Sequence, residues 1–163
     1  MRIYIASDHG GFELKSSLKA FLKEKPGFEI EDCGAHAFNA DDDYPEIIAR
    51  AARKLSADTL AGKDSRAIVV GASGQGEAIV ANRFKAVRCA TYYGSAGEQK
   101  DMSGKTLDMI ASTREHNNSN ALSLGARFLT VEEAKRAVEK WLKTEFSGEE
   151  RHARRIKQID EVS

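Results

Sequence analysis

The stretch from Ala67 to Arg83, AIVVGASGQGEAIVANR, constrains the fold of this chain more than any other part of it. An apolar run at its start stops at three glycines, Gly71, Gly74 and Gly76, and a helical pattern with Glu77 in its first turn follows at once. The pattern predicts a strand, a tight turn and a helix. In a parallel α/β sheet such a turn offers unpaired backbone N–H groups and the positive end of a helix to an anion. We therefore expect an anion or oxyanion cradle here, with Glu77 as a candidate base.

Two other interpretations of this loop stay open. Its glycines match the dinucleotide pattern GxGxxG poorly, and no acidic residue follows the next predicted strand, Val87 to Thr91, where a ribose would need one. A simple tight turn is the other possibility. Glu77 has its own structural alternative, because a carboxylate in the first turn of a helix complements the helix dipole. Whether its side chain faces a pocket decides between a cap and a base.

Strand and helix patterns alternate along the rest of the chain. A capping box, Thr130 with Glu133, marks the start of the last strongly amphipathic helix. The alternation predicts an α/β sandwich with a mostly parallel sheet of five strands and right-handed crossovers. The predicted strands cover residues 2–7, 28–33, 67–70, 87–91 and 121–124, and the clearest helices cover 12–25, 45–55 and 131–143.

Length and charge narrow the classes of function. At 163 residues we expect a single domain over residues 1–163, and 25 Lys+Arg against 25 Asp+Glu give no basic excess for holding nucleic acid. The start of the chain turns polar after a short strand, and no apolar run has membrane-spanning length, so we expect neither a signal peptide nor a membrane segment. The two cysteines, Cys33 and Cys89, form no disulfide framework or metal pattern, which indicates a cytoplasmic protein.

Polar residues follow the predicted strands at the edge where a parallel sheet binds its ligands. Asp8 and His9 come directly after the first strand and indicate either a pocket role or a turn cap with a surface imidazole. Asp41, Asp42 and Asp43 are consecutive, so their side chains diverge, and no glutamate follows at the spacing of a calcium loop. We expect a solvated, helix-capping acidic run there and no metal site.

Two further groups lie away from that edge. His116 and Asn117 precede a strand, so within one chain they would lie at its amino end, far from the expected site. Arg151 and Arg155 are one helical turn apart in a charged tail, and together they suit a phosphate, although a solvated face or a weak nucleic-acid patch is the alternative. The tail, residues 148–163, has few large aliphatic residues, so we expect it to pack on another element or another subunit.

Taken together in this order, the motifs of the chain resemble those of ribose-5-phosphate isomerase type B and the related galactose-6-phosphate isomerase subunits. The motifs cover nearly the whole chain and are IASDHGGFELK, DCGA, DDDYP, VVGASGQGEAIVANR, REHNN, LGAR and RHARR. The resemblance implies a Rossmann-like three-layer sandwich and a metal-independent enzyme of carbohydrate metabolism, in the pentose phosphate pathway, that needs no cofactor. It also implies a homodimer, or a tetramer, with sugar-phosphate sites at the subunit interface, which would let one subunit complete the pocket of another.

Residue roles follow from the same resemblance. Many family members have a cysteine as base where this chain has Gly71, whereas a second branch has a glutamate at the end of the glycine loop, which Glu77 matches. Glu77 would move a proton between C1 and C2 through a cis-enediolate, and His116, assisted by Asp8, would open the furanose ring. The phosphate would be bound by arginines and a histidine of both subunits. The implied catalytic residues are Glu77, His116, Asp8 and Ser73, and the implied substrate-binding residues are His9, Tyr44, Gly71, Gly74, Gly76, Asn117, Arg127, Arg151, His152 and Arg155.

The segment from residue 92 to residue 113 departs from this pattern. It is longer than the family resemblance leads us to expect, and it follows the fourth strand on the pocket side, where it would narrow the site or change the length of sugar accepted. The alternatives to a ribose 5-phosphate isomerase are therefore an isomerase of a tetrose or hexose phosphate, such as erythrulose 4-phosphate, allose 6-phosphate or galactose 6-phosphate, and a non-catalytic phosphosugar- or nucleotide-binding module.

Overall fold

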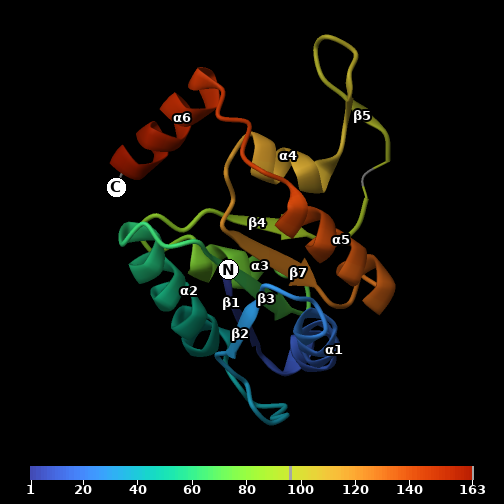
Figure 1. Cartoon of the computed structure of the whole chain (residues 1–163). Helices are drawn as coiled ribbons and strands as arrows, with labels where there is room; N and C mark the ends of the chain where they lie inside the picture. Colours follow the sequence, from blue (N-terminus) through green and yellow to red (C-terminus); the bar gives the residue numbers. More distant parts are fainter. Residues whose placement is uncertain (96, 163) are drawn as a thin grey trace.

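A five-stranded sheet forms the centre of the molecule in the computed structural model, which describes residues 1–95 and 97–162 (Figure 1). All of its neighbouring strands pair in parallel, in the order β2-β1-β3-β7-β4. The sheet is therefore wholly parallel, and the α/β fold predicted from the sequence is confirmed. The strands are β1 (Arg2–Ser7), β2 (Glu29–Asp32), β3 (Ser65–Gly71), β4 (Cys89–Tyr92) and β7 (Ala121–Gly125).

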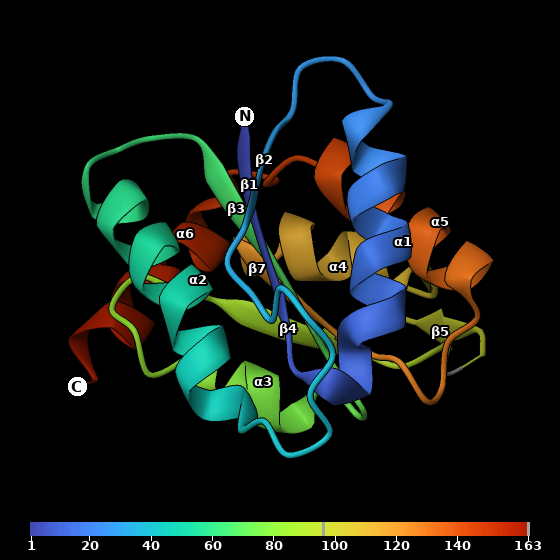
Figure 2. The ribbon, with the colours of Figure 1, turned by 90° about the horizontal axis from the view of Figure 1, so that it is seen from below.

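Helices cover both faces of this sheet (Figure 2). Successive side chains of β1 point to opposite faces, so Ile3 and Ile5 join one apolar core, whereas Tyr4 and Ala6 join the other. The first core includes residues of α1 (Phe12–Lys23), α4 (Met109–Glu115) and α5 (Val131–Lys143), and the second includes residues of α2 (Tyr44–Leu60) and α3 (Gln75–Ala81). A short 3-10 helix, η1 (His9–Gly11), links β1 to α1.

The local signals in the sequence locate most element ends to within a few residues. The predicted capping box is present, since the Thr130 side chain accepts from the Glu133 N–H at 3.2 Å and the Glu133 carboxylate accepts from the Thr130 N–H at 2.8 Å. The helix predicted over residues 45–55 is too short, because the helix continues to Leu60, where buried Asp58 still packs against the fold. The buried apolar residues of α2 form the apolar face that the sequence pattern predicted, and they are Ile47, Ile48, Ala51, Ala52 and Leu55.

The segment that the sequence marked as extra forms a β-hairpin and a short helix. The hairpin strands are β5 (Gln99–Lys100) and β6 (Thr106–Leu107), and within residues 1–95 and 97–162 they pair with each other alone, in antiparallel fashion. Figure 1 shows this hairpin above α4, away from the five-stranded sheet.

The charged tail forms α6 (Glu150–Glu161), of whose described residues only His152 is buried. No helix in the described part of the chain combines the length and apolar character needed to cross a membrane.

Trp141 of α5 provides a test of the first core. Its side chain is fully buried, and its indole N–H donates to the Ser119 hydroxyl at 2.8 Å. We expect Trp141→Ala to lower the free energy of unfolding by about 3–5 kcal/mol, because it leaves a large cavity. Urea denaturation measures this loss, with the exposed Lys143→Ala as the control, for which we expect a change of about 0.5 kcal/mol or less. Equal losses for both variants would contradict this account of the core.

Candidate active site

The carboxyl ends of β1, β3 and β7 bring most of the predicted site residues to one edge of the sheet. β1 leads into Asp8 and His9, β3 leads into the glycine loop, and β7 leads into Arg127. Two hydrogen bonds join the last two loops, because the N–H groups of Ala126 and Arg127 donate to the carbonyls of Gly71 and Ala72 at 2.8 and 3.0 Å. We call this group of residues the loop half-site, and it consists of Asp8, His9, Asp42, Tyr44, residues 71–77 and Arg127.

The Glu77 side chain is buried, with only 4% of the residue exposed, and it lies against Gly71 rather than in solvent. A Cβ atom added at Gly71 would overlap the Glu77 carboxyl group. Gly71 therefore provides the space that the carboxyl group occupies, and any larger residue there would displace it. A solvated carboxylate that only complements the helix dipole would not be buried in this way, so the structure argues against the interpretation of Glu77 as a solvated cap.

The environment of Glu77 makes its carboxylate a stronger base than usual. Burial raises the pKa of Glu77 above its ordinary value, and the nearby negative charge of Asp8 raises it further. Burial likewise raises the pKa of Asp8, whose carboxylate accepts a hydrogen bond from the Gly11 N–H at 3.2 Å. A glutamate with a raised pKa is suited to taking a proton from carbon at neutral pH.

The loop that precedes Glu77 requires its glycines. Gly74 has a φ angle of +76°, and a Cβ on it would lie 2.9 Å from the backbone carbon of Leu124, so both conformation and space demand glycine. A Cβ on Gly76 would lie 2.8 Å from Cζ of Tyr44, which places the Tyr44 ring over the start of α3. Ser73 contributes its hydroxyl to the same turn, since it accepts from the Gln75 N–H at 3.3 Å.

Asp42 is a member of this half-site that the sequence analysis placed in solvent. Its carboxylate accepts from the backbone N–H of His9 at 3.0 Å, and the same Oδ1 atom lies 2.7 Å from His9 Nδ1. This hydrogen bond raises the pKa of His9. The expectation of a solvated, helix-capping run is thus wrong for Asp42, and Asp43 occupies the N-cap of α2 without a side-chain cap bond. Ligand atoms of Asp8, His9 and Asp42 lie within 4.8 Å of one another, a spacing at which these three residues could hold a cation.

His116 and Asn117 lie at the opposite end of the sheet, just after α4 and before β7. The buried His152 of α6 stacks on His116, with ring centroids 4.5 Å apart and an angle of 13° between the planes. Burial, together with the proximity of His116 and Arg151, lowers the pKa of His152. Two imidazoles and an arginine therefore meet at this end, in a cluster suited to an anion or to proton transfer.

The arginines of α6 lie beside this stack and are exposed. Arg151 donates to the Glu149 carboxylate at 2.7 Å, and it lines one hollow of about 450 Å³ together with His116 and His152. Arg155 follows one helical turn later on α6, also exposed. We call this second group the histidine half-site, and it consists of His116, Asn117, Arg151, His152 and Arg155.

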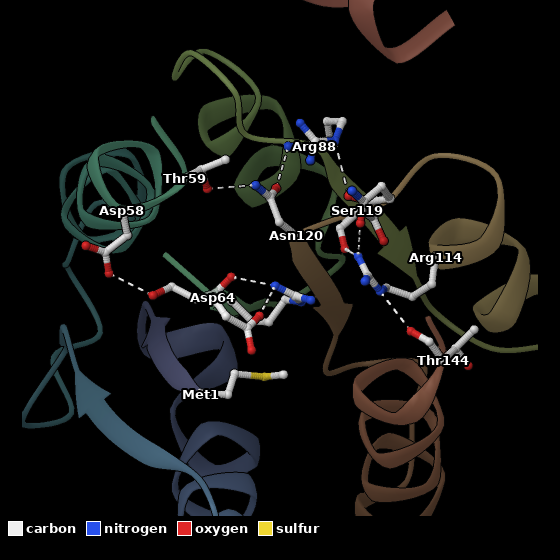
Figure 3. A network of polar contacts seen from close by, with 12 residues as sticks. Met1, Asp58, Thr59, Asp64, Arg88, Arg114, Ser119, Asn120 and Thr144 are labelled. Atoms are coloured by element: carbon white, nitrogen blue, oxygen red, sulfur yellow. Dashed lines mark hydrogen bonds and ion pairs between the residues drawn. The ribbon is translucent and has the colours of Figure 1, made fainter. Parts of the chain in front are cut away.

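Arg114, which the sequence analysis did not single out, bonds several segments around the end of α4 (Figure 3). The turn after α4 carries His116. The buried guanidinium of Arg114 donates to the carbonyl of Ser119 at 2.6 Å, the side chain of Asn118 at 2.8 Å and the carbonyl of Thr144 at 3.1 Å. These bonds join the end of α4, the start of β7 and the end of α5. Burial lowers the pKa of Arg114 to about 10, and the group keeps its charge at neutral pH. Its position in REHNN was the only signal in the sequence.

The two half-sites do not meet within one chain. Ala121 and Gly125 mark the two ends of β7, which lie about 13 Å apart at about 3.3 Å per residue. His116 precedes the first end, whereas the glycine loop adjoins the second, where Gly71 pairs with Gly125. Within one chain, therefore, Asp8 is not placed to assist His116. Among the described residues, each half-site also contains a buried polar atom without a hydrogen-bond partner, which is Asp42 Oδ2 in one and His152 Nε2 in the other.

Comparison with known proteins identifies the family of this chain. The family model for Ribose/Galactose Isomerase matches residues 3–159. The chain belongs to this family. The resemblance stated from its sequence motifs is thereby confirmed.

Individual relatives agree over nearly the whole chain. The ribose-5-phosphate isomerase B of Mycolicibacterium paratuberculosis is 40% identical over 156 residues, which are 96% of this chain and 87% of that protein. The crystal structure of ribose-5-phosphate isomerase B from Mycoplasma genitalium with bound ribulose-5-phosphate is similar with a TM-score of 0.85 and 33% identity, over 98% of this chain and 94% of that chain. The corresponding protein of Clostridium thermocellum gives a TM-score of 0.82 and 37% identity, over 99% of this chain and 97% of that chain.

The raised pKa of Glu77 predicts that ionisation of this side chain destabilises the folded protein. Folding favours the protonated carboxyl group, so its contribution to stability is present at low pH and is lost as the pH rises through the folded-state pKa. Gln, which stays neutral, avoids this loss. We therefore expect Glu77→Gln to raise the melting temperature at about pH 8 and to change it little at about pH 4.

Thermal unfolding at both pH values measures the effect, and Glu46→Gln, a change at an exposed glutamate in the first turn of α2, is the matched control. A gain for Glu77→Gln that is equal at both pH values, or absent at the higher one, would contradict the raised pKa.

Proposed function

We propose that this chain is an aldose–ketose isomerase that interconverts ribose 5-phosphate and ribulose 5-phosphate through a cis-enediolate. The observation that carries the proposal is the buried Glu77 carboxyl group, which fills the space that Gly71 leaves open in the glycine loop of a Ribose/Galactose Isomerase family member. The relatives named ribose-5-phosphate isomerase B, and the Mycoplasma structure with bound ribulose-5-phosphate, support the choice of substrate.

The reaction needs a base that serves two neighbouring carbons. The Glu77 carboxylate takes the proton from C2 of the open-chain aldose. The electron pair of that C–H bond forms the C1–C2 double bond, and the carbonyl electrons move to O1 to give the enediolate. N–H groups of the glycine loop, with the Ser73 hydroxyl, stabilise the charged oxygen. Glu77 then returns the proton to C1 while the hydroxyl proton of O2 passes to O1, which leaves a carbonyl at C2.

We propose further that the working site is built from two chains. The loop half-site of one subunit supplies Glu77, with His9 and Tyr44 for sugar oxygens, and the histidine half-site of its partner supplies His116 for ring opening and Asn117 for sugar hydroxyls. Across this interface Asp8 would assist His116, although the two residues lie apart in one chain. Buried atoms of Asp42 and His152 lack a hydrogen-bond partner among the described residues, and α6 is mostly exposed. Both observations support an arrangement in which each chain completes the other.

The phosphate would then be held by cationic groups of both subunits. Arg127 comes from the loop half-site, whereas Arg151, His152 and Arg155 come from the partner's histidine half-site. A phosphate fixed in this way holds the opened chain in position over Glu77, where proximity contributes much of the rate enhancement. The assembly would be a homodimer, or a tetramer built from it, and the free thiols Cys33 and Cys89 are in keeping with a reducing cytoplasm.

Glu77→Gln tests the proposed base, because an amide cannot take the proton from carbon. We expect at least about a thousandfold loss of kcat on ribose 5-phosphate, with binding of the sugar phosphate retained. Turnover assays and calorimetric titration with the substrate measure the two quantities, with Glu46→Gln as the control. Retained turnover would remove Glu77 from the mechanism, and a parent protein that isomerises no four- to six-carbon sugar phosphate would overturn the proposed function.

Mixing two inactive variants tests the shared site. A Glu77→Gln chain and an Arg151→Ala chain carry their defects in opposite half-sites, so a mixed dimer has one site with both defects and one site with neither. Random exchange at equal amounts should restore about a quarter of the unmutated activity. Activity is measured after subunit exchange has been verified by mass spectrometry of the intact dimer. No recovery after verified exchange would show that each site is built within a single chain.

A further inference from the structure

The hairpin formed by residues 97–107 has no role in the reaction as described above, yet it lies beside one of the two half-sites. Its strands contain two residues each, and every described residue from 97 to 106 is exposed. So small a hairpin is at most marginally stable in water on its own. It is held internally by Asp101, whose carboxylate accepts from the N–H groups of Ser103 and Lys105 at 2.8 and 3.0 Å. The turn is therefore organised by its own sequence chemistry.

The tip and one strand of the hairpin face the histidine half-site. Asp101, Met102 and Ser103 line the hollow of about 450 Å³ that also contains His116 and Arg151. Lys105 and β6 line a second hollow, of about 190 Å³, that again includes His116 and Arg151. Two separate hollows thus bring the hairpin together with the same ring-opening histidine and phosphate-binding arginine.

We propose that this hairpin is a specificity-determining wall of the active site, which limits the length of the sugar phosphate that the enzyme accepts. The inference rests on the proposed isomerase function and deepens it. Met102 is the residue that forms the wall, since its side chain is fully exposed at the tip and presents an apolar surface where the half-site is otherwise polar.

The geometry of the shared site gives this wall its direction of effect. Glu77 fixes the position of C1 and C2, and Arg151 of the other chain fixes the phosphate, so the sugar lies extended between two anchored ends. The hairpin tip lines the same hollow as Arg151, so in the proposed arrangement the phosphate end of a longer sugar is accommodated beside the hairpin. A sugar phosphate one carbon longer therefore meets the hairpin, whereas one carbon shorter does not.

Hydrogen bonds of Asp108 attach the base of the hairpin to α4 and α5, as a wall of fixed position requires. Asp108, the first residue after β6, caps α4 by accepting from the Ala111 N–H at 2.9 Å, and its other oxygen receives Lys140 of α5 at 2.6 Å. The base of the hairpin is thereby joined to the same helix that ends at His116. The base of the hairpin and His116 therefore lie at the two ends of the same helix, α4.

Two variants test the wall. In the first, residues 98–106 are replaced by a Gly-Gly pair; in the second, Met102→Ala shortens only the tip. Steady-state kinetics with four-, five- and six-carbon aldose phosphates give kcat/KM for each. We expect the ratio of the six-carbon to the five-carbon value to rise at least about tenfold on hairpin replacement. We expect a smaller rise for Met102→Ala, because it removes only three side-chain heavy atoms at the tip. The exposed Leu60→Ala, at the end of α2, is the matched apolar control and should leave the ratio unchanged.

The outcomes separate this inference from the function on which it rests. Activity of the parent on five-carbon substrates tests the isomerase, whereas the ratio tests the hairpin. An unchanged ratio in an active Met102→Ala variant and an active replacement variant would overturn the wall, and so would an equal fall in kcat/KM for all three lengths, which a merely structural hairpin would give. If the replacement variant does not fold, the ratio for Met102→Ala decides alone. A parent without isomerase activity overturns both proposals.

Discussion

The parallel direction of the strands is the constraint on which the rest of this structure depends. In a parallel sheet every strand ends at the same edge, so the loops after β1, β3 and β7 meet there and form the loop half-site. The chain enters β7 from α4 at the other edge, and this leaves His116 at the amino end of a strand whose carboxyl end adjoins the glycine loop. Two sets of groups with complementary chemistry are thus built into one chain, but the sheet itself keeps them apart.

The second physical feature of the site is that the Glu77 carboxyl group occupies the volume that a side chain at position 71 would fill. A residue with a side chain at position 71 and a buried carboxyl group from position 77 would occupy the same volume. The fold therefore accepts one or the other. Burial of the carboxyl group has a cost in stability, since the charged form loses its hydration, and the same loss of hydration makes the group a better base. Stability and reactivity are coupled at this residue through its solvation.

The histidine half-site depends on a different device, which is a buried cation that holds backbone segments together. Arg114 bonds the start of β7 and the end of α5 to the turn after α4, so the position of His116 depends on three elements at once. The stacked His152 extends this arrangement to α6, a helix that makes little other contact with its own chain. The hairpin is joined to α4 through Asp108, which caps that helix, so the hairpin and the turn that carries His116 adjoin the same helix.

The sequence by itself determined the layered fold, since the alternation of strand and helix patterns, the glycine loop and the capping box at Thr130 are local features that act over a few residues. It also determined which residue types were candidates, because the motifs carry Glu77, His116 and Arg151. The hairpin could not be predicted from periodicity, because strands of two residues have no period. Nothing in three consecutive aspartates distinguishes Asp42, whose hydrogen bonds with His9 join residues far apart in the sequence. The separation of His116 from the glycine loop also followed from the sequence, because His116 precedes a strand. Only the tertiary structure decided that Glu77 occupies the space beside Gly71 and that His152 stacks on His116. Burial and distance between elements depend on how the strands pair, and that pairing joins residues far apart in the chain.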